Sequence, residues 1–175
     1  LTFERDKDLF KFFKKKNIEW IQHKTNGIIR GLKYRKDWKK KWVDEMNSKI
    51  SLSDLNSINK TKIEISKKIP IYSQKLISDK KFQPGGEDFA WMYMQSFLKK
   101  RHKGYTRNIS SPINSRTSCS RLSPYITYGN LSSRQVYQFF SSSKNRDLVN
   151  FLSRLQWRCH FMQKFDDEPS MEFNN

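Results

Sequence analysis

The stretch formed by residues 115–135 is rich in the side chains that hold phosphate groups. Ser and Thr hydroxyls are interspersed there with three Arg, and acidic residues are absent. Such a segment makes a poor core. Backbone amides in a turn before a helix favour an anion instead, because orphan N–H groups and the positive end of the helix dipole both attract negative charge. Pro124 cannot lie in a helix interior, which places residues 120–123 in such a turn. We therefore predict that this turn holds phosphate.

Two stripes of side chains share one predicted helix that follows Leu148. The first stripe is apolar and typical of a core; it consists of Leu148, Phe151, Leu152, Leu155 and Met162. The second has the spacing i, i+3, i+4, i+7; it consists of Arg154, Trp157, Arg158 and Phe161. Cations paired with aromatics are typical of a surface that stacks a flat conjugated ligand or a nucleobase. The alternative is that both aromatics are core while both Arg extend into water.

Residues 1–47 contain the pattern of a helix, a short strand and a second helix. Helical apolar spacing covers residues 3–16, and the strand pattern covers residues 18–23, before an Asn-Gly turn. The second helix is expected from about Gly31 to Asn47. Its apolar residues repeat at i, i+4 and i+8, as in a core stripe, with a nucleic-acid contact as the alternative; they are Trp38, Trp42 and Met46. This order indicates the end of an α/β unit.

The remainder divides into a connection and a helical part. Residues 48–81 are rich in Ser, Asn, Lys and Ile without a clear period, which favours an interdomain linker. A helix is then expected from Glu87, after a Pro-Gly-Gly breaker, to a cap at Gly104. Residues 105–118 have the composition of a loop, and Ser132 is a candidate N-cap for the next helix.

The charge of the chain concerns its partners more than its fold. Of 175 residues, 35 are Lys or Arg and 17 are Asp or Glu, a formal net charge of +18. Nucleic acid is the expected partner, with an anionic membrane surface or an inert basic protein as alternatives. Cys119 and Cys159 have no metal-ligand spacing, and the default is a reducing, intracellular setting. No apolar run approaches a membrane span. The sequence begins at Leu1 rather than at Met, and it stops directly after a helical pattern. We expect both features in a fragment.

Several motifs in order resemble the photolyase and cryptochrome family. They are residues 82–87 (Phe-Gln-Pro-Gly-Gly-Glu), 105–108 (Tyr-Thr-Arg-Asn), 120–125 (Ser-Arg-Leu-Ser-Pro-Tyr), 132–135 (Ser-Ser-Arg-Gln) and 151–158 (Phe-Leu-Ser-Arg-Leu-Gln-Trp-Arg). The resemblance implies a mainly α chain. Residues 1–47 would end an α/β antenna domain, 48–81 would be the linker, and 82–175 would be the N-terminal part of an all-helical FAD-binding domain.

The resemblance also implies roles for individual residues. The flavin-contacting set consists of Tyr105 on the phosphate side, the pyrophosphate-gripping turn Cys119, Ser120, Arg121, Leu122 and Ser123, Phe151 near the cofactor, and Arg158 beside the ring. Trp157 resembles the tryptophan that stacks on a pyrimidine dimer flipped out of DNA. Light-excited reduced FAD would pass an electron to that dimer, and a second antenna chromophore of unknown identity is possible in the family.

Departures from the family pattern leave the activity open. Arg154 stands where many repair enzymes have Glu, and Cys119 replaces the usual Thr. These changes fit a divergent bacterial branch or a cryptochrome photoreceptor as well as a repair enzyme. A plain nucleic-acid-binding module without cofactor is the third reading. The family's later flavin-binding segment would follow Asn175, so this chain alone is expected to bind FAD weakly or not at all and to be inactive.

Overall fold

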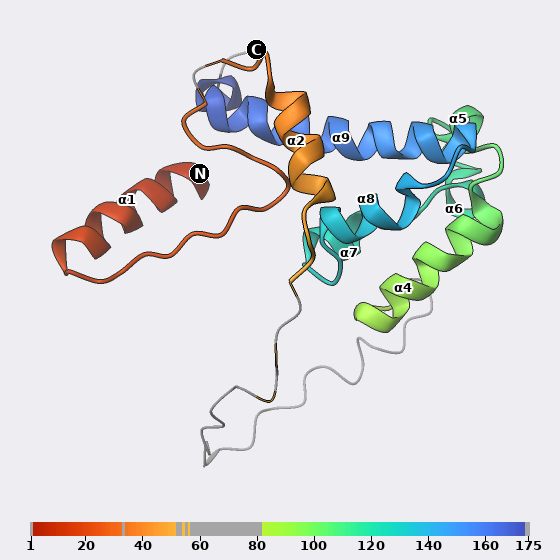
Figure 1. Cartoon of the computed structure of the whole chain (residues 1–175), viewed down its shortest axis with the longest axis horizontal. Coiled ribbons are helices and arrows are strands. Elements are labelled where there is room, and N and C mark those ends of the chain that lie inside the picture. Colours follow the sequence, from red (N-terminus) through yellow and green to blue (C-terminus); the bar gives the residue numbers. More distant parts are fainter. Residues whose placement is uncertain (1, 33, 52–53, 55, 57–81, 174–175) are drawn as a thin grey trace.

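The chain folds into a mainly helical structure, as predicted (Figure 1). The computed structural model describes residues 2–32, 34–51, 54, 56 and 82–173. No strand is present in those ranges. Most of the predicted linker, residues 48–81, lies outside the described residues, so the linker remains a prediction.

The N-terminal part contains a helix and an extended segment. Helix α1 spans Thr2–Lys15, and Asn17, two residues later, has a φ of 53°, a left-handed conformation that does not continue the helix. The predicted strand at residues 18–23 is wrong. Those residues are extended, but none of the described residues pairs with them in a ladder, and a strand needs a partner for its backbone groups. The α/β character expected for residues 1–47 is therefore not present in the described part.

Helix α2 spans Trp38–Asn47 and begins later than predicted. Gly31 has a φ of +70°, a left-handed conformation that does not continue a helix, so the segment before Trp38 is irregular. Trp38, Trp42 and Met46 are all buried, which confirms the predicted core stripe.

Four short elements follow the breaker at Gly86. They are α4 (Glu87–Ser96), a π-helical turn (Phe97–Arg101), α5 (Tyr105–Asn108) and α6 (Ser115–Ser118). Gly104 has a φ of +77°, as expected for the cap. The expectation that residues 105–118 form only loop is wrong. The backbone amides of Gly104 and Thr106 donate to the carboxylate of Asp147, 2.9 and 2.8 Å away, and this distant side chain supports the start of α5.

The C-terminal part contains the longest element. Helix α7 spans Ser123–Thr127 and α8 spans Ser133–Ser141, with the predicted N-cap Ser132 in a capping box with Gln135. Helix α9 spans Arg146–Asp167, and a 3₁₀ turn spans Pro169–Glu172. Helix α9 lies across the molecule and packs against α5 and α8, while α8 also packs against α2 (Figure 1). A cluster of edge-to-face rings fills the space under α9: Phe97, Tyr105, Phe140 and Phe151.

Candidate functional site

The hydroxyl-rich turn, residues 119–123, is held in place by hydrogen bonds to its backbone carbonyl groups. Arg121 has a φ of 61°, the left-handed conformation that reverses the chain before α7. The carbonyl of Arg121 accepts a hydrogen bond from Nε2 of Gln83 at 2.8 Å. The carbonyls of Cys119 and Ser120 both accept from the guanidinium of Arg101. Leu122 is buried in the core and anchors the far end of the turn.

Because the carbonyls point toward these partners, the amides of the turn remain for a ligand. No described residue accepts a hydrogen bond from the backbone N–H of Ser120 or of Arg121. Leu122 N–H makes only a 3.4 Å contact with the Ser120 hydroxyl, and Ser123 opens α7 with an exposed hydroxyl. The unpaired amides, the Ser hydroxyls and the side chain of Arg121 form a set of donors that fits a phosphate or pyrophosphate group.

Arg101 is the residue of this site that the sequence did not indicate. It lies in a Lys-Lys-Arg run that predicts exposed cations at a helix end. Its guanidinium turns inward instead and also bonds the carbonyl of Tyr93 at 2.6 Å and the hydroxyl of Ser96 at 2.9 Å. The change from Lys to Arg within the run was the available signal, since only the guanidinium fork serves several acceptors at once.

Tyr105 is the member of the ring cluster that interacts electrostatically with Cys119 of the turn. It is buried, and its ring packs edge-to-face on Phe151 at 5.9 Å. Burial, with a smaller contribution from nearby Cys119, raises the pKa of Tyr105 to about 12, and Arg154 opposes that shift. Burial likewise raises the pKa of the Cys119 thiol, against Arg101 and Arg121. The structure thus groups Tyr105, Cys119 and Arg154 electrostatically, as a neutral phenol and thiol beside a cation.

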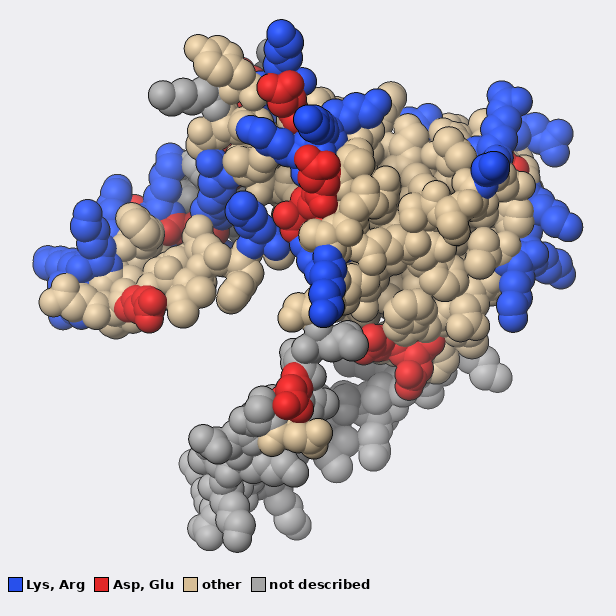
Figure 2. Space-filling view, in the orientation of Figure 1, with Lys and Arg blue, Asp and Glu red and all other residues tan. Residues whose placement is uncertain are grey.

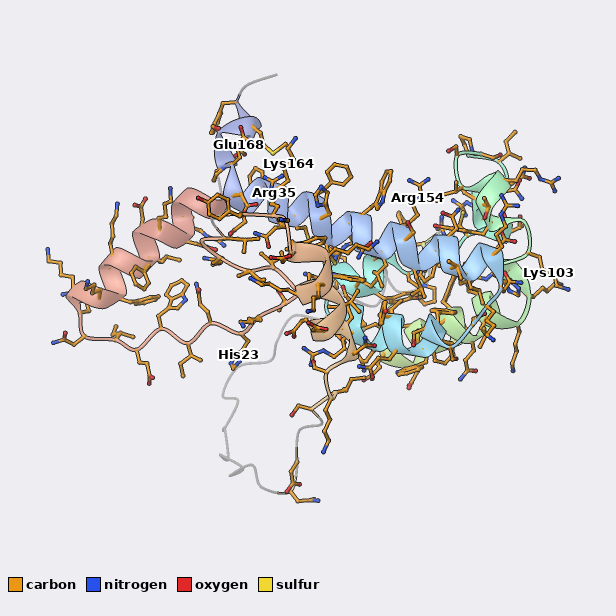
Figure 3. The ribbon with its side chains drawn as sticks, turned by 45° about the horizontal axis from the view of Figure 1, so that its top comes forward. His23, Arg35, Lys103, Arg154, Lys164 and Glu168 are labelled. Atoms are coloured by element: carbon orange, nitrogen blue, oxygen red, sulfur yellow. The ribbon has the colours of Figure 1, made fainter. Side chains whose placement is uncertain are left out.

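The exposed face of α9 carries three of the four residues of the second stripe. The guanidinium of Arg154, which is labelled in Figure 3, lies over the Trp157 ring, 4.6 Å from its centroid. Trp157 meets Phe161 edge-to-face at 6.4 Å. Trp157 and Phe161 are 51% and 57% exposed. The alternative that both rings belong to the core is therefore wrong. Both rings line a pocket of about 480 Å³ whose far wall includes Arg35 and Trp38.

The fourth member, Arg158, is not grouped with the others. Its Nη1 donates to Oδ1 of Asn26 at 2.9 Å, and the Ser133 hydroxyl donates to the same oxygen at 2.6 Å. Asn26 itself has a φ of 57°. The sequence indicated Asn26 only as part of a turn. No local signal shows that its side chain accepts a hydrogen bond from Arg158, which lies 132 residues further along the chain.

Two further classes of site find no support in the described part of the chain. No group of three or more His, Cys, Asp or Glu side chains there could hold a metal ion. None of the helices there has the length and apolar character needed to cross a membrane.

Comparison with known proteins gives one informative similarity. The chain is 38% identical over 86 residues to a deoxyribodipyrimidine photo-lyase of Alkalihalophilus pseudofirmus. The match covers 48% of this chain and 18% of that relative. No family model matches the chain, and no solved structure matches it. The similarity confirms the resemblance carried by the ordered motifs.

Proposed function

From the premise that the chain is a partial homologue within the photolyase and cryptochrome family, we propose that it takes part in FAD-dependent, light-driven repair of pyrimidine dimers in DNA. The observation that carries the proposal is the turn at residues 119–123. Its carbonyls are tied to Arg101 and Gln83, and the amides of Ser120 and Arg121 have no acceptor among the described residues.

The proposed flavin contacts divide into those that the geometry supports and one that rests on the resemblance. The turn would hold the pyrophosphate of FAD through its amides and the Ser120 and Ser123 hydroxyls. The ring contact of Tyr105 with Phe151 and its electrostatic interaction with Cys119 support Tyr105 as a further contact. Arg158 is proposed as a flavin contact on the resemblance alone, since its guanidinium is bound to Asn26. Bound FAD, reduced and photoexcited, would supply the electron that splits the dimer.

The proposed lesion contact is Trp157. Its half-exposed ring offers an apolar face to a base that has been flipped out of the DNA duplex. Stacking of a base on an aromatic ring contributes about 1–3 kcal/mol per base. Arg154, above the same ring, adds positive charge where a DNA phosphate would approach. The domain assignment of residues 1–47, 48–81 and 82–175, and a second chromophore, belong to the same proposal.

A second candidate function, blue-light signalling without repair, is favoured by one observation. Arg154 stands at the position of an expected Glu and its guanidinium is engaged with Trp157, so no carboxyl is available there to assist the dimer. Visible light and dimer-containing DNA distinguish the two functions, because only a repair enzyme restores intact bases.

The cofactor proposal is tested by titrating the protein with FAD and, separately, with inorganic pyrophosphate. We expect saturable shifts of the Ser120 and Arg121 amide resonances in NMR spectra with both ligands. The amide of Gln95, on the exposed face of α4, serves as the control and should not shift. Absence of any shift at Ser120 and Arg121 with either ligand would contradict the proposed cradle.

A further inference from the structure

Asn26 is followed by Gly27, and an Asn-Gly pair is chemically labile. The Gly27 nitrogen can attack Cγ of the Asn26 side chain, because glycine has no side chain to obstruct the approach. A bond forms between that nitrogen and Cγ, the bond from Cγ to Nδ2 breaks, and the proton of the Gly27 N–H leaves with the amide as ammonia. Water then opens the succinimide ring, and Asp or isoaspartate remains at position 26.

The backbone turn at Asn26 and Gly27 holds the pair in a conformation that opposes this reaction. Their φ angles are 57° and 64°, and Ile28 N–H donates to the Thr25 carbonyl at 3.2 Å, as in a type I′ turn. In such a turn the Gly27 nitrogen points away from the Asn26 side chain, so ring closure requires the turn to open. Gly27 is also packed so closely on Trp42 that a Cβ there would lie 2.6 Å from Cδ1 of the ring.

The side-chain amide of Asn26 is restrained through its oxygen alone. Oδ1 accepts from Nη1 of Arg158 at 2.9 Å and from the Ser133 hydroxyl at 2.6 Å. The two groups that react are not restrained in this way, since neither Asn26 Nδ2 nor Gly27 N–H donates a hydrogen bond to any described residue. Asn26 also lines a pocket of about 900 Å³, which gives water access to the amide.

We propose that Asn26 is a deamidation site that Arg158 keeps closed, so that release of Arg158 allows Asn26 to become Asp or isoaspartate. Ser133 is buried at the start of α8 and has little freedom to move, whereas the long side chain of Arg158 is half-buried and can turn away. A hydrogen bond from a charged donor also contributes more than one from a neutral hydroxyl. This inference goes beyond the proposed function, since it requires no cofactor, no DNA and no light.

The carboxylate that deamidation leaves would hold Arg158 more firmly than the amide does. Asp at position 26 would accept from the same guanidinium as a charge-assisted pair, which is stronger than a hydrogen bond to a neutral amide. Figure 2 shows many Lys and Arg side chains around α1, in the N-terminal part that contains Asn26, so the new negative charge would arise in positive surroundings. Because ammonia is lost, the change does not reverse.

The test follows the tryptic peptide of residues 25–30 by mass spectrometry while the intact protein is incubated at mildly alkaline pH. Asn26 carries the one amide side chain of that peptide, Thr-Asn-Gly-Ile-Ile-Arg, so its mass change reports this site alone. Arg158→Met removes the guanidinium, and Arg146→Met, at an exposed position of the same helix, is the matched control. We expect conversion to be slower in the wild type than in the free synthetic peptide and at least about tenfold faster in Arg158→Met than in the wild type. Arg146→Met should convert at the wild-type rate.

Three outcomes would overturn the proposal. The first is wild-type conversion as fast as in the free peptide, and the second is a wild-type rate in Arg158→Met. The third is a rise in Arg158→Met that only matches a rise in brief tryptic cleavage after Lys24, because opening of the whole segment would then govern the reaction. Should Arg158→Met fail to fold, Ser133→Ala removes the other donor to Oδ1 and should also speed conversion; a wild-type rate there would contradict the proposal. Every measurement is made without FAD, so failure here is distinguishable from failure of the flavin proposal.

Discussion

Tyr105 joins the aromatic core to the hydroxyl-rich turn through one side chain. Its ring belongs to the edge-to-face cluster, and its environment includes Cys119 and Arg154. A buried phenol cannot ionise easily, because the phenolate would lose its hydration. The group should therefore remain a neutral hydrogen-bonding side chain at physiological pH, suited to a phosphate neighbour that a phenolate would repel.

The raised pKa of Tyr105 predicts a fall in stability at high pH. Between about pH 10, where an unfolded tyrosine ionises, and about pH 12, the unfolded chain binds fewer protons than the folded chain. The contribution of Tyr105 to the free energy of unfolding should decrease through this window by about 2–3 kcal/mol. Urea unfolding at a series of pH values measures it, with Tyr105→Phe as the variant that lacks this fall.

Tyr128 provides the matched control, since it is 84% exposed. Tyr128→Phe should leave the pH dependence as in the wild type, and ultraviolet titration should show that Tyr105→Phe removes one late-ionising phenol. Burial raises the pKa of Tyr125 as well, so a second late-ionising phenol should remain in that variant. If Tyr105→Phe and wild type lost stability in parallel from pH 10 to 12, the buried phenol would not be its source.

Residue identities revealed the chemistry of the turn but not what holds it. Hydroxyl content and Pro124 predicted a turn able to bind an anion, and the turn is present at that place. Arg101 and Gln83 hold it through carbonyls that are distant in sequence. The single Arg after two Lys was a local signal for Arg101, whereas no local pattern identified Gln83. Likewise, spacing put Arg158 on a stripe with Arg154, but a contact with Asn26 draws it away.

At the scale of elements, periodic patterns predicted helices well and irregular segments poorly. The stripe on α2, the N-cap of α8 and the apolar stripe of α9 follow from local spacing and capping. The strand at residues 18–23 was wrong because strand propensity has no structural effect without a partner. The short helices α5 and α6 depend on tertiary contacts such as that of Asp147, which composition does not show.

Gly27 sets how closely the N-terminal segment approaches α2. It has a φ of +64°, and a Cβ built there would lie 2.6 Å from Cδ1 of Trp42, a ring that is itself buried. Gly27→Ala should therefore lower the free energy of unfolding by about 2 kcal/mol or more, from backbone strain and overpacking together. Chemical denaturation of the two proteins measures the difference.

Gly85 is the matched control for this substitution. A Cβ at Gly85 meets no atom within 4 Å, and its φ lies outside the left-handed region. Gly85→Ala should change the free energy of unfolding by less than about 0.5 kcal/mol. Equal effects at the two glycines would show that the contact between Gly27 and Trp42 does not constrain the fold.

At the scale of the whole molecule, a polar junction fastens the N-terminal segment to the end of α9. The fully buried Gln163 accepts from Ile29 N–H at 2.8 Å and donates to Ile29 C=O at 3.0 Å. It also donates to Asp167 at 2.6 Å, and Asp167 pairs with Arg35 at 2.7 Å. Apolar periodicity did not predict this junction, since a Gln on the buried side of a helix interrupts the pattern.

Gln163→Leu should loosen the N-terminal segment before it disturbs the helical part. The substitution keeps the side-chain volume but leaves the N–H and C=O of Ile29 without partners, which costs about 2–4 kcal/mol when both groups stay buried. Opening that segment from α9 lets water satisfy those groups, and so local opening becomes the lower-energy response. Trypsin should then cleave after Lys24 faster than in the wild type, while Gln95→Leu, at an exposed position of α4, should leave that rate unchanged. Unchanged cleavage at Lys24 in Gln163→Leu would mean that packing alone, and not the bonds of Gln163, holds the two ends of the chain together.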